Sequence, residues 1–226
     1  MFTIKNITRN PQLINADKII LGIGVLAITM PLIVYLAALP APQCLKNGML
    51  HSISAYYHTD ARDLLVGMIC ALSFCFMAYN GYSKVDKIAS TIASFSALGV
   101  ALIPTSIFAG EYDCIPSDGT FLREYIHLFC AVVLLLTMAF FSIKIFTHRE
   151  GGDTIAPRKL FFYRFWGYCI LASLGLIALY VLFLKEAVPI TATWHPIFWL
   201  ETVCLFSFGC SWLLKSGLFD FGTAKK

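Results

Sequence analysis

Charged residues are scarce in this sequence, because Asp, Glu, Lys and Arg make up only 13% of its 226 residues. A water-soluble domain usually carries about 25% charged residues to cover its surface. The shortage therefore argues against a soluble enzyme or a soluble binding module. The net charge of +4 is small, and no basic stripe with interleaved aromatic residues predicts RNA or DNA binding.

The chain also lacks linkers, internal repeats and low-complexity tracts, so we expect a single domain over residues 1–226. The first eighteen residues are polar, and no small-residue cleavage site follows the next apolar run, so we expect no signal peptide. No CxxC motif and no Cys/His spacing predicts a zinc finger.

What the sequence has instead is a series of long apolar runs, and 58% of its residues are hydrophobic. A helix of about 20 residues spans about 30 Å of hydrocarbon. The sequence therefore predicts an all-α fold, a polytopic membrane protein with a six-helix transmembrane bundle. The expected spans are residues 19–40, 63–83, 88–110, 123–146, 161–184 and 195–215.

The basic residues indicate an orientation. With six spans, one side of the membrane carries thirteen of the 17 Lys and Arg residues, and the other side carries only Lys46, Arg62, Arg123 and Lys185. Cytoplasmic loops are enriched in Lys and Arg. We therefore expect both termini in the cytoplasm, with the inner membrane of a bacterium as the location.

The expected outer side holds most of the acids and histidines, and its densest stretch is HSISAYYHTDARD, residues 51–63. Read as a helical turn or two, it places Ser54 and His58 four residues apart, as it does His58 and Arg62. Tyr57 belongs at the interface, where amphipathic aromatic rings are favoured. His58 as a water-facing loop residue and Asp63 as a partner of the helix N-terminus remain open alternatives.

Two ionisable residues fall inside expected spans, His127 one turn deep and Glu201 nearly two turns deep. Such residues usually face the bundle interior or a wet cavity. His127 as a structural hydrogen-bonding residue, and Glu201 in a salt bridge with Arg62 or Arg123, are the simplest roles. We hypothesise that residues 51–63, His127 and Glu201 form the walls of one polar pocket.

Smaller signals complete the expectation. Pro104 removes a backbone donor and predicts a kink near the end of the third span. Gly22 and Gly24 are typical of close helix packing. Cys44 and Cys114 fall in two outer loops, where an oxidising exterior favours a disulfide bond between them, with two free thiols as the alternative.

Four segments together resemble a known family: HSISAYYHTDARDLLVG, SALGVALIPT, YIHLFCAVVLLLTMAF and FWLETVCLFSFGCSWLLKSG. Their order and spacing over residues 19–217 are similar to those of an uncharacterised bacterial family of six-span membrane proteins. That family is related to the damage-regulated autophagy modulator and fibroblast-growth-factor-receptor-activating-protein group. The resemblance implies a six-helix bundle and no settled activity.

A more distant resemblance is to the ceramidase-like membrane hydrolases, which carry a serine and a histidine four residues apart, an aspartate on the next span and a late pair of histidines. Ser54 and His58 match the first spacing, and Asp63 and His127 can stand in for later members. The last span departs from the pattern, because it has His195 and Glu201 in place of HxxxH.

Three classes of function stay open. The first is a ligand-binding protein, scaffold or sensor, in which Tyr57, Arg62, Arg123, His127 and Glu201 hold a lipid headgroup or a small ligand. The second is a metal-dependent hydrolase of a lipid amide or ester. There the cofactor is unknown, with zinc as the candidate, and His58, His127 and Asp63 would hold the metal. Glu201 or Asp63 would act as base or ligand, and Ser54, Tyr57 or Arg62 would stabilise an oxyanion. The third is a transporter or channel. Membrane lipids are the expected partners, with a homo-oligomer or a second membrane protein as alternatives.

Overall fold

The computed structural model of the chain describes residues 16–39, 49–79, 81, 83–107, 120–148, 155–184 and 194–218. These residues form helices and no β-strand, which confirms the all-α class. The α-helices are α1 (Ala16–Ala38), α2 (Arg62–Ala78), α3 (Lys84–Leu102), α4 (Phe121–Phe140), α5 (Pro157–Leu179) and α6 (Pro196–Lys215). The shorter segments are the 3₁₀ helix η3 (Ser54–His58) and the π-helical ends η4 (Phe141–Ile145) and η5 (Tyr180–Leu184).

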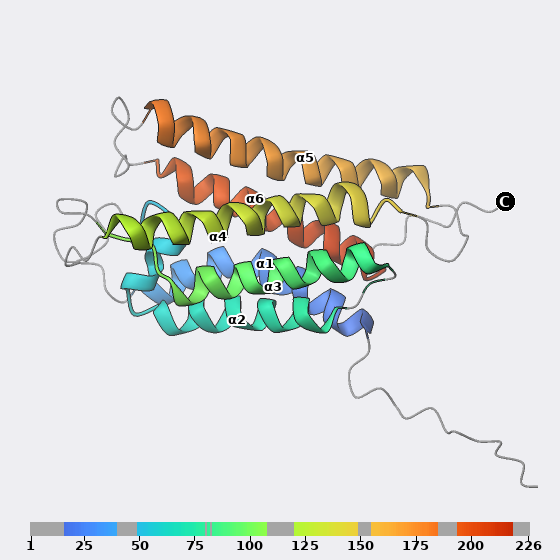
Figure 1. The fold of residues 1–226 in the computed structure, drawn as a ribbon, viewed down its shortest axis with the longest axis horizontal. Coiled ribbons are helices and arrows are strands. Elements are labelled where there is room, and N and C mark those ends of the chain that lie inside the picture. The colour runs from blue at the N-terminus through green and yellow to red at the C-terminus, as the bar shows by residue number, and fades with distance from the viewer. Residues whose placement is uncertain are drawn as a thin grey trace, which may run out of the picture.

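The six helices form a closed ring. Each packs against its neighbour in sequence, and α6 closes the ring by packing on α1. Successive helices run in opposite directions, with α2 and α5 at opposite edges of the bundle (Figure 1). One end holds η3 and the starts of α2, α4 and α6, and we call it the wedge end. The start of α1 and the end of α6 lie at the other end, which we call the basic end.

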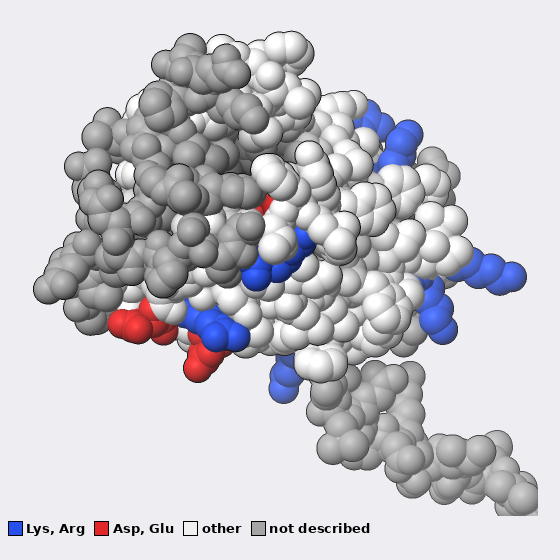
Figure 2. Space-filling view, turned by 60° about the vertical axis from the view of Figure 1, so that its left-hand side comes forward, with Lys and Arg blue, Asp and Glu red and all other residues white. Residues whose placement is uncertain are grey.

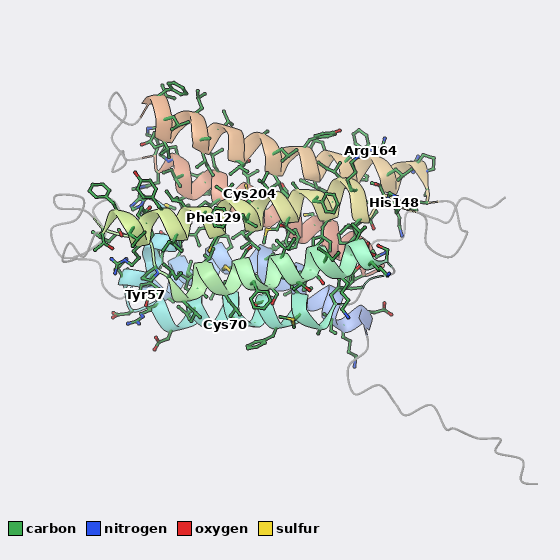
Figure 3. All side chains as sticks on the ribbon, viewed as in Figure 1. Tyr57, Cys70, Phe129, His148, Arg164 and Cys204 are labelled. Atoms are coloured by element: carbon green, nitrogen blue, oxygen red, sulfur yellow. The ribbon has the colours of Figure 1, made fainter. Side chains whose placement is uncertain are left out.

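Five of the helical segments are long and apolar enough to cross a membrane. They are Asp17–Ala38, Lys84–Leu102, Phe121–Ile145, Pro157–Leu184 and Pro196–Lys215. The helix α2 is not among them, because its 17 residues extend only about 25 Å. Large apolar side chains point outward around the ring; Phe129 on α4, for example, is 70% exposed (Figure 3).

Basic side chains are prominent at the basic end, although Asp17 and Asp86 also lie there, in the first turns of α1 and α3. In Figure 2 the acidic side chains that can be seen lie at the wedge end, and the far end shows basic side chains. Figure 3 places Tyr57 at the wedge end and His148 and Arg164 at the basic end. The described structure therefore keeps the asymmetry of basic residues on which the expected orientation depends.

The helix α3 ends earlier than the sequence predicted. The expected span ran to residue 110 with a kink at Pro104, whereas the helix stops at Leu102 and Ile103 is extended, with φ −111° and ψ 95°. Proline disfavours the helical conformation of the residue before it, so the helix terminates instead of bending. The expected kink is wrong, and the backbone groups of residues 103–106 need other partners.

An aromatic cluster fills the ring towards the basic end. Trp212 of α6 is fully buried, and its ring lies 5.0 Å from that of Tyr79 and 5.1 Å from that of Phe146, measured between centroids. Phe76 and Phe141 also contact Trp212, at 5.9 and 5.4 Å. Aromatic residues bury large areas, so this cluster forms much of the core in that half of the bundle.

Two glycines let α1 and α6 approach closely. A Cβ atom on Gly209 would lie 2.7 Å from the carbonyl oxygen of Gly24 and would also clash with Ile28. A Cβ on Gly24 would lie 3.0 Å from the carbonyl oxygen of Gly209. Gly24 thus has the packing role predicted for it, whereas Gly22 faces open space.

This contact gives a stability prediction. The new methyl group of Gly209→Ala would push against the backbone of Gly24 and the side chain of Ile28. We expect a loss of about 1–3 kcal/mol of unfolding free energy, as for other overpacked sites. Gly22→Ala, on α1, is the matched control. We expect no loss of stability from it, because nothing lies near its new methyl group. Thermal unfolding of the purified variants in detergent measures both, and equal stability of the two would contradict the close α1–α6 packing.

Candidate functional site

Residues 51–61, which we call the wedge, fold into a compact unit at the end of the ring. The hydroxyl of Ser52 accepts a hydrogen bond from Ala55 N at 3.1 Å and so caps the start of η3. The hydroxyl of Thr59 donates to Tyr56 O at 2.8 Å and closes its end. Tyr56 and Ala61 have no exposed surface. The polar stretch is therefore a buried structural element and not a loop in water.

Two hydrogen bonds join the wedge to the first turns of α6, one donated from each side. Phe198 N donates to His51 O at 2.9 Å, and Ile53 N donates to the Glu201 carboxylate at 2.6 Å. The rings of Tyr56 and Phe198 pack 6.0 Å apart. Glu201 thus binds a backbone N–H of the wedge and neither Arg62 nor Arg123, so the salt-bridge alternative is wrong.

The wedge and α4 also provide hydrogen-bond partners for the backbone groups that follow the end of α3. His58 Nε2 lies 2.8 Å from Thr105 O, and His127 Nδ1 lies 2.6 Å from Ile103 O. A carboxylate oxygen of Glu124 accepts from Ser106 N at 2.6 Å and from the Thr105 hydroxyl at 3.0 Å.

These contacts fix the protonation of both imidazoles. A carbonyl oxygen can only accept, so His58 must carry hydrogen on Nε2 and His127 on Nδ1. In the neutral form the lone pair of His127 is then on Nε2. The structural role left open for His127 is the one its geometry supports, because its side chain is 3% exposed and holds the end of α3.

A cavity of about 80 Å³ lies inside the ring below the wedge. Its polar lining residues are Glu201 and Ser54, and the rest of its wall is apolar. The apolar wall is formed by Met30, Ile53, Ile69, Leu72, Phe76, Ala97, Val100, Ala131, Leu134, Leu135, Met138 and Leu205. Five helices and the wedge thus enclose a space with room for a short aliphatic group or a few waters.

A second, much smaller cavity of about 10 Å³ lies beside the first. Ser54, Tyr57, Pro104 and His127 are among its lining residues. Ser54 borders both cavities, and its hydroxyl forms no hydrogen bond with the described part of the chain. The structure therefore places the 51–63 segment between Glu201 on one side and His127 on the other.

The predicted metal ligands are not assembled. Within the described ranges, no three His, Cys, Asp or Glu side chains come together as a metal site. Asp63 is exposed at the start of α2, while the His58 and His127 rings hold carbonyl oxygens of residues 103–105. Zinc therefore does not fit the described residues as three ligands, and no metal-bound water has a place among them.

The other predicted residues lie at the rim. Arg62 donates to the Tyr57 hydroxyl at 2.9 Å and stacks over its ring, with 4.6 Å from the guanidinium carbon to the centroid. Arg123 is half-buried in the first turn of α4. Cys44 and Cys114 lie outside the described residues, so their disulfide stays a prediction.

Two histidines that the sequence did not single out lie where the wedge meets α6. His51 is 6% and His195 is 4% exposed. His195 has φ 43° and ψ 63°, a left-handed conformation uncommon outside glycine, and neither of its ring nitrogens has a hydrogen-bond partner in the described structure. The signal in the sequence was His195 before Pro196, which marks the start of a helix.

Burial keeps both imidazoles neutral. Together with a smaller effect of charge repulsion from the nearby His195 and His58, it lowers the pKa of His51 from 6.5 to about 4. Burial also lowers the pKa of His195. Among the described residues, no carboxylate shifts the pKa of either histidine.

Comparison of the chain with protein-family models, with curated proteins and with solved structures finds no match. The family resemblances drawn from the four sequence segments therefore stay predictions.

The Glu124 contacts give a second prediction. Glu124→Leu leaves Ser106 N and the Thr105 hydroxyl without an acceptor in a buried position, and we expect a loss of about 1–3 kcal/mol of unfolding free energy. Glu124→Gln keeps a carbonyl acceptor and should retain most of the stability. Tyr125→Leu, on the exposed neighbour, is the control, and denaturation in detergent is the measurement. A Glu124→Leu protein as stable as the control would contradict the assignment.

Proposed function

We propose that this protein is a six-span integral membrane protein whose central cavity binds a small amphiphile, with Glu201 and Ser54 at the polar end of the ligand. The observation that carries the proposal is the cavity itself. It is apolar along its length and has one carboxylate and one unpaired hydroxyl at the wedge end.

The membrane location rests on the five long apolar helices and on their exposed apolar faces. We infer that α2 is the sixth span, because it lies within the ring beside α1 and α3 and runs along the same axis. The wedge adds buried structure before α2 and compensates for its short length. Basic residues at the opposite end support cytoplasmic termini, and the proposed location is a bacterial inner membrane.

Reporter fusions test the span of α2. We expect a reporter fused after Met49 to be outside the cytoplasm, and reporters fused after Gly81 and His148 to be inside it. Alkaline phosphatase and green fluorescent protein, read in parallel, report the two sides. The same side for the Met49 and Gly81 fusions would show that α2 does not span.

The chemistry of the cavity defines the class of ligand. A carboxylate in an apolar space needs hydrogen-bond donors or a positive charge. One oxygen of Glu201 already accepts from Ile53 N, which leaves the other for a ligand. An aliphatic alcohol or primary amine supplies the donor, whereas a fatty acid would bring a second carboxylate close to the first. Membrane lipids and their breakdown products are the source of such molecules.

The hydrolase alternative has less support. A metal-dependent reaction needs ligands that converge with an open position for water, and the described residues provide no such group. Ser54 and His58 are four residues apart, as in the ceramidase-like pattern, but His58 is directed to Thr105 O. Ser54 lines the cavity and its hydroxyl has no partner among the described residues, which supports a role in contacting a ligand.

Photolabelling tests the binding proposal. We expect an eight-carbon primary amine or alcohol that carries a diazirine to label cavity residues such as Met30 and Leu205, and the matching carboxylic acid to label them several-fold less. Ala131→Leu fills the cavity and should abolish this labelling. Ala172→Leu makes the same substitution at an exposed position of α5 and should leave the labelling unchanged.

Comparing the acid probe with the amine probe distinguishes binding at Glu201 from simple hydrophobic partition of the probe into the cavity. Glu201→Gln keeps the acceptor for Ile53 N and removes the charge, so labelling by the amine should fall more than labelling by the alcohol. Equal labelling by all three probes, or labelling that survives in Ala131→Leu, would refute binding in the cavity.

A further inference from the structure

The contact between the wedge and α6 joins two buried imidazoles at a single point. Phe198 N donates to His51 O, and Phe198 lies three residues after His195, at the first turn of the same helix. Both side chains are more than nine-tenths buried. Movement of the wedge away from α6 would therefore change the surroundings of both side chains.

His195 is held in an unfavourable state by this docking. Its two ring nitrogens are buried without hydrogen-bond partners among the described residues, and its backbone has the left-handed conformation of φ 43°. A neutral imidazole leaves one donor and one acceptor unsatisfied here, and an imidazolium would leave two donors and a charge. Release of the wedge would hydrate the ring and allow the backbone to relax.

We propose that His51 and His195 form an acid-sensitive latch, which holds the wedge on α6 at neutral pH and releases it when the histidines take up protons. Release would open the wedge end of the central cavity, whose wall includes Ile53 and Ser54 of the wedge. The gating of ligand entry rests on the proposed function, whereas the acid response of the wedge does not.

Among the described residues, no carboxylate is one of the groups that shift the pKa of a latch histidine. His58 at the end of η3 adds a further repulsion. Glu201 is the nearest acid on α6, and it is held by Ile53 N on the inner side of the wedge. The remaining groups on the packed elements are Tyr35 of α1, Tyr56 of η3, and Arg62 and the exposed Asp63 at the start of α2.

The direction of the pH response follows from the docked and released states. Burial lowers the pKa of His51 in the docked state to about 4, below the value of 6.5 expected after release. The released wedge therefore binds protons more readily, so docking is at full strength above pH 6.5 and weakens as the pH falls towards 4. The opening equilibrium should rise about tenfold per pH unit in this range if one histidine responds, and more steeply if both do.

Hydrogen–deuterium exchange of the full-length protein, without added ligand, measures this equilibrium. The amides of Ile53 and Phe198 report docking directly, because they are the donors of the two hydrogen bonds between the wedge and α6. After correction for intrinsic exchange rates, we expect their protection to fall between pH 6.5 and 4.5. The amides around Trp212 in the aromatic cluster should stay protected, which separates release of the wedge from unfolding.

Variants identify the groups responsible. His51→Gln and His195→Asn cannot be protonated, and Asn tolerates the left-handed conformation of residue 195. Each should reduce the pH dependence, and the double variant should abolish it, while the docking bond of His51 O remains because it belongs to the backbone. His148→Gln, at the basic end, is the matched control and should behave as the wild type.

Two results would overturn the latch: protection of Ile53 and Phe198 that does not change with pH in the wild type, or a pH dependence that persists in the double variant. Because no amphiphile is present, either result can occur whether or not the cavity binds one. Failure of photolabelling with an intact pH response would instead reject the proposed ligand and leave the latch in place.

Discussion

Backbone groups released where a helix ends inside a bundle must find partners, and this requirement organises the wedge end of the protein. The helix α3 stops before Pro104, and the carbonyl oxygens and N–H groups of residues 103–106 are then bound by His58, His127 and Glu124. Glu201 does the same for Ile53 N. Buried backbone groups in proteins are almost always paired. Most of the titratable side chains here therefore have a structural role as hydrogen-bond partners of the backbone.

The division of the ring into a filled half and a hollow half follows from side-chain size. Trp212 and the aromatic rings around it occupy the centre near the basic end. Nearer the wedge the facing positions carry smaller residues such as Ala97 and Ala131, and the centre stays open. The wedge closes this space from one end, because Ile53 and Ser54 form part of the cavity wall.

Three described side chains of the wedge end have polar atoms that these structural contacts do not use. Ser54 has a hydroxyl without a partner in the described structure, Glu201 has one oxygen that is not used by Ile53, and His195 has two unsatisfied nitrogens. The first two face the cavity and suggest a ligand with hydrogen-bond donors. The third lies where the wedge meets α6 and suggests a contact that acid weakens.

The sequence by itself determined the depth of each residue along the bundle. Apolar runs gave the helices and their order, and they correctly brought the 51–63 segment, His127 and Glu201 to one end. Hydropathy carries no information about rotation around the bundle axis or about exact partners. Only the tertiary structure decided that Glu201 binds Ile53 N instead of an arginine, that His58 and His127 hold the end of α3 instead of a metal, and that His195 is buried beside His51. Those outcomes depend on which backbone groups the packing of the ring leaves unsatisfied, and that is settled only when all the helices are in place.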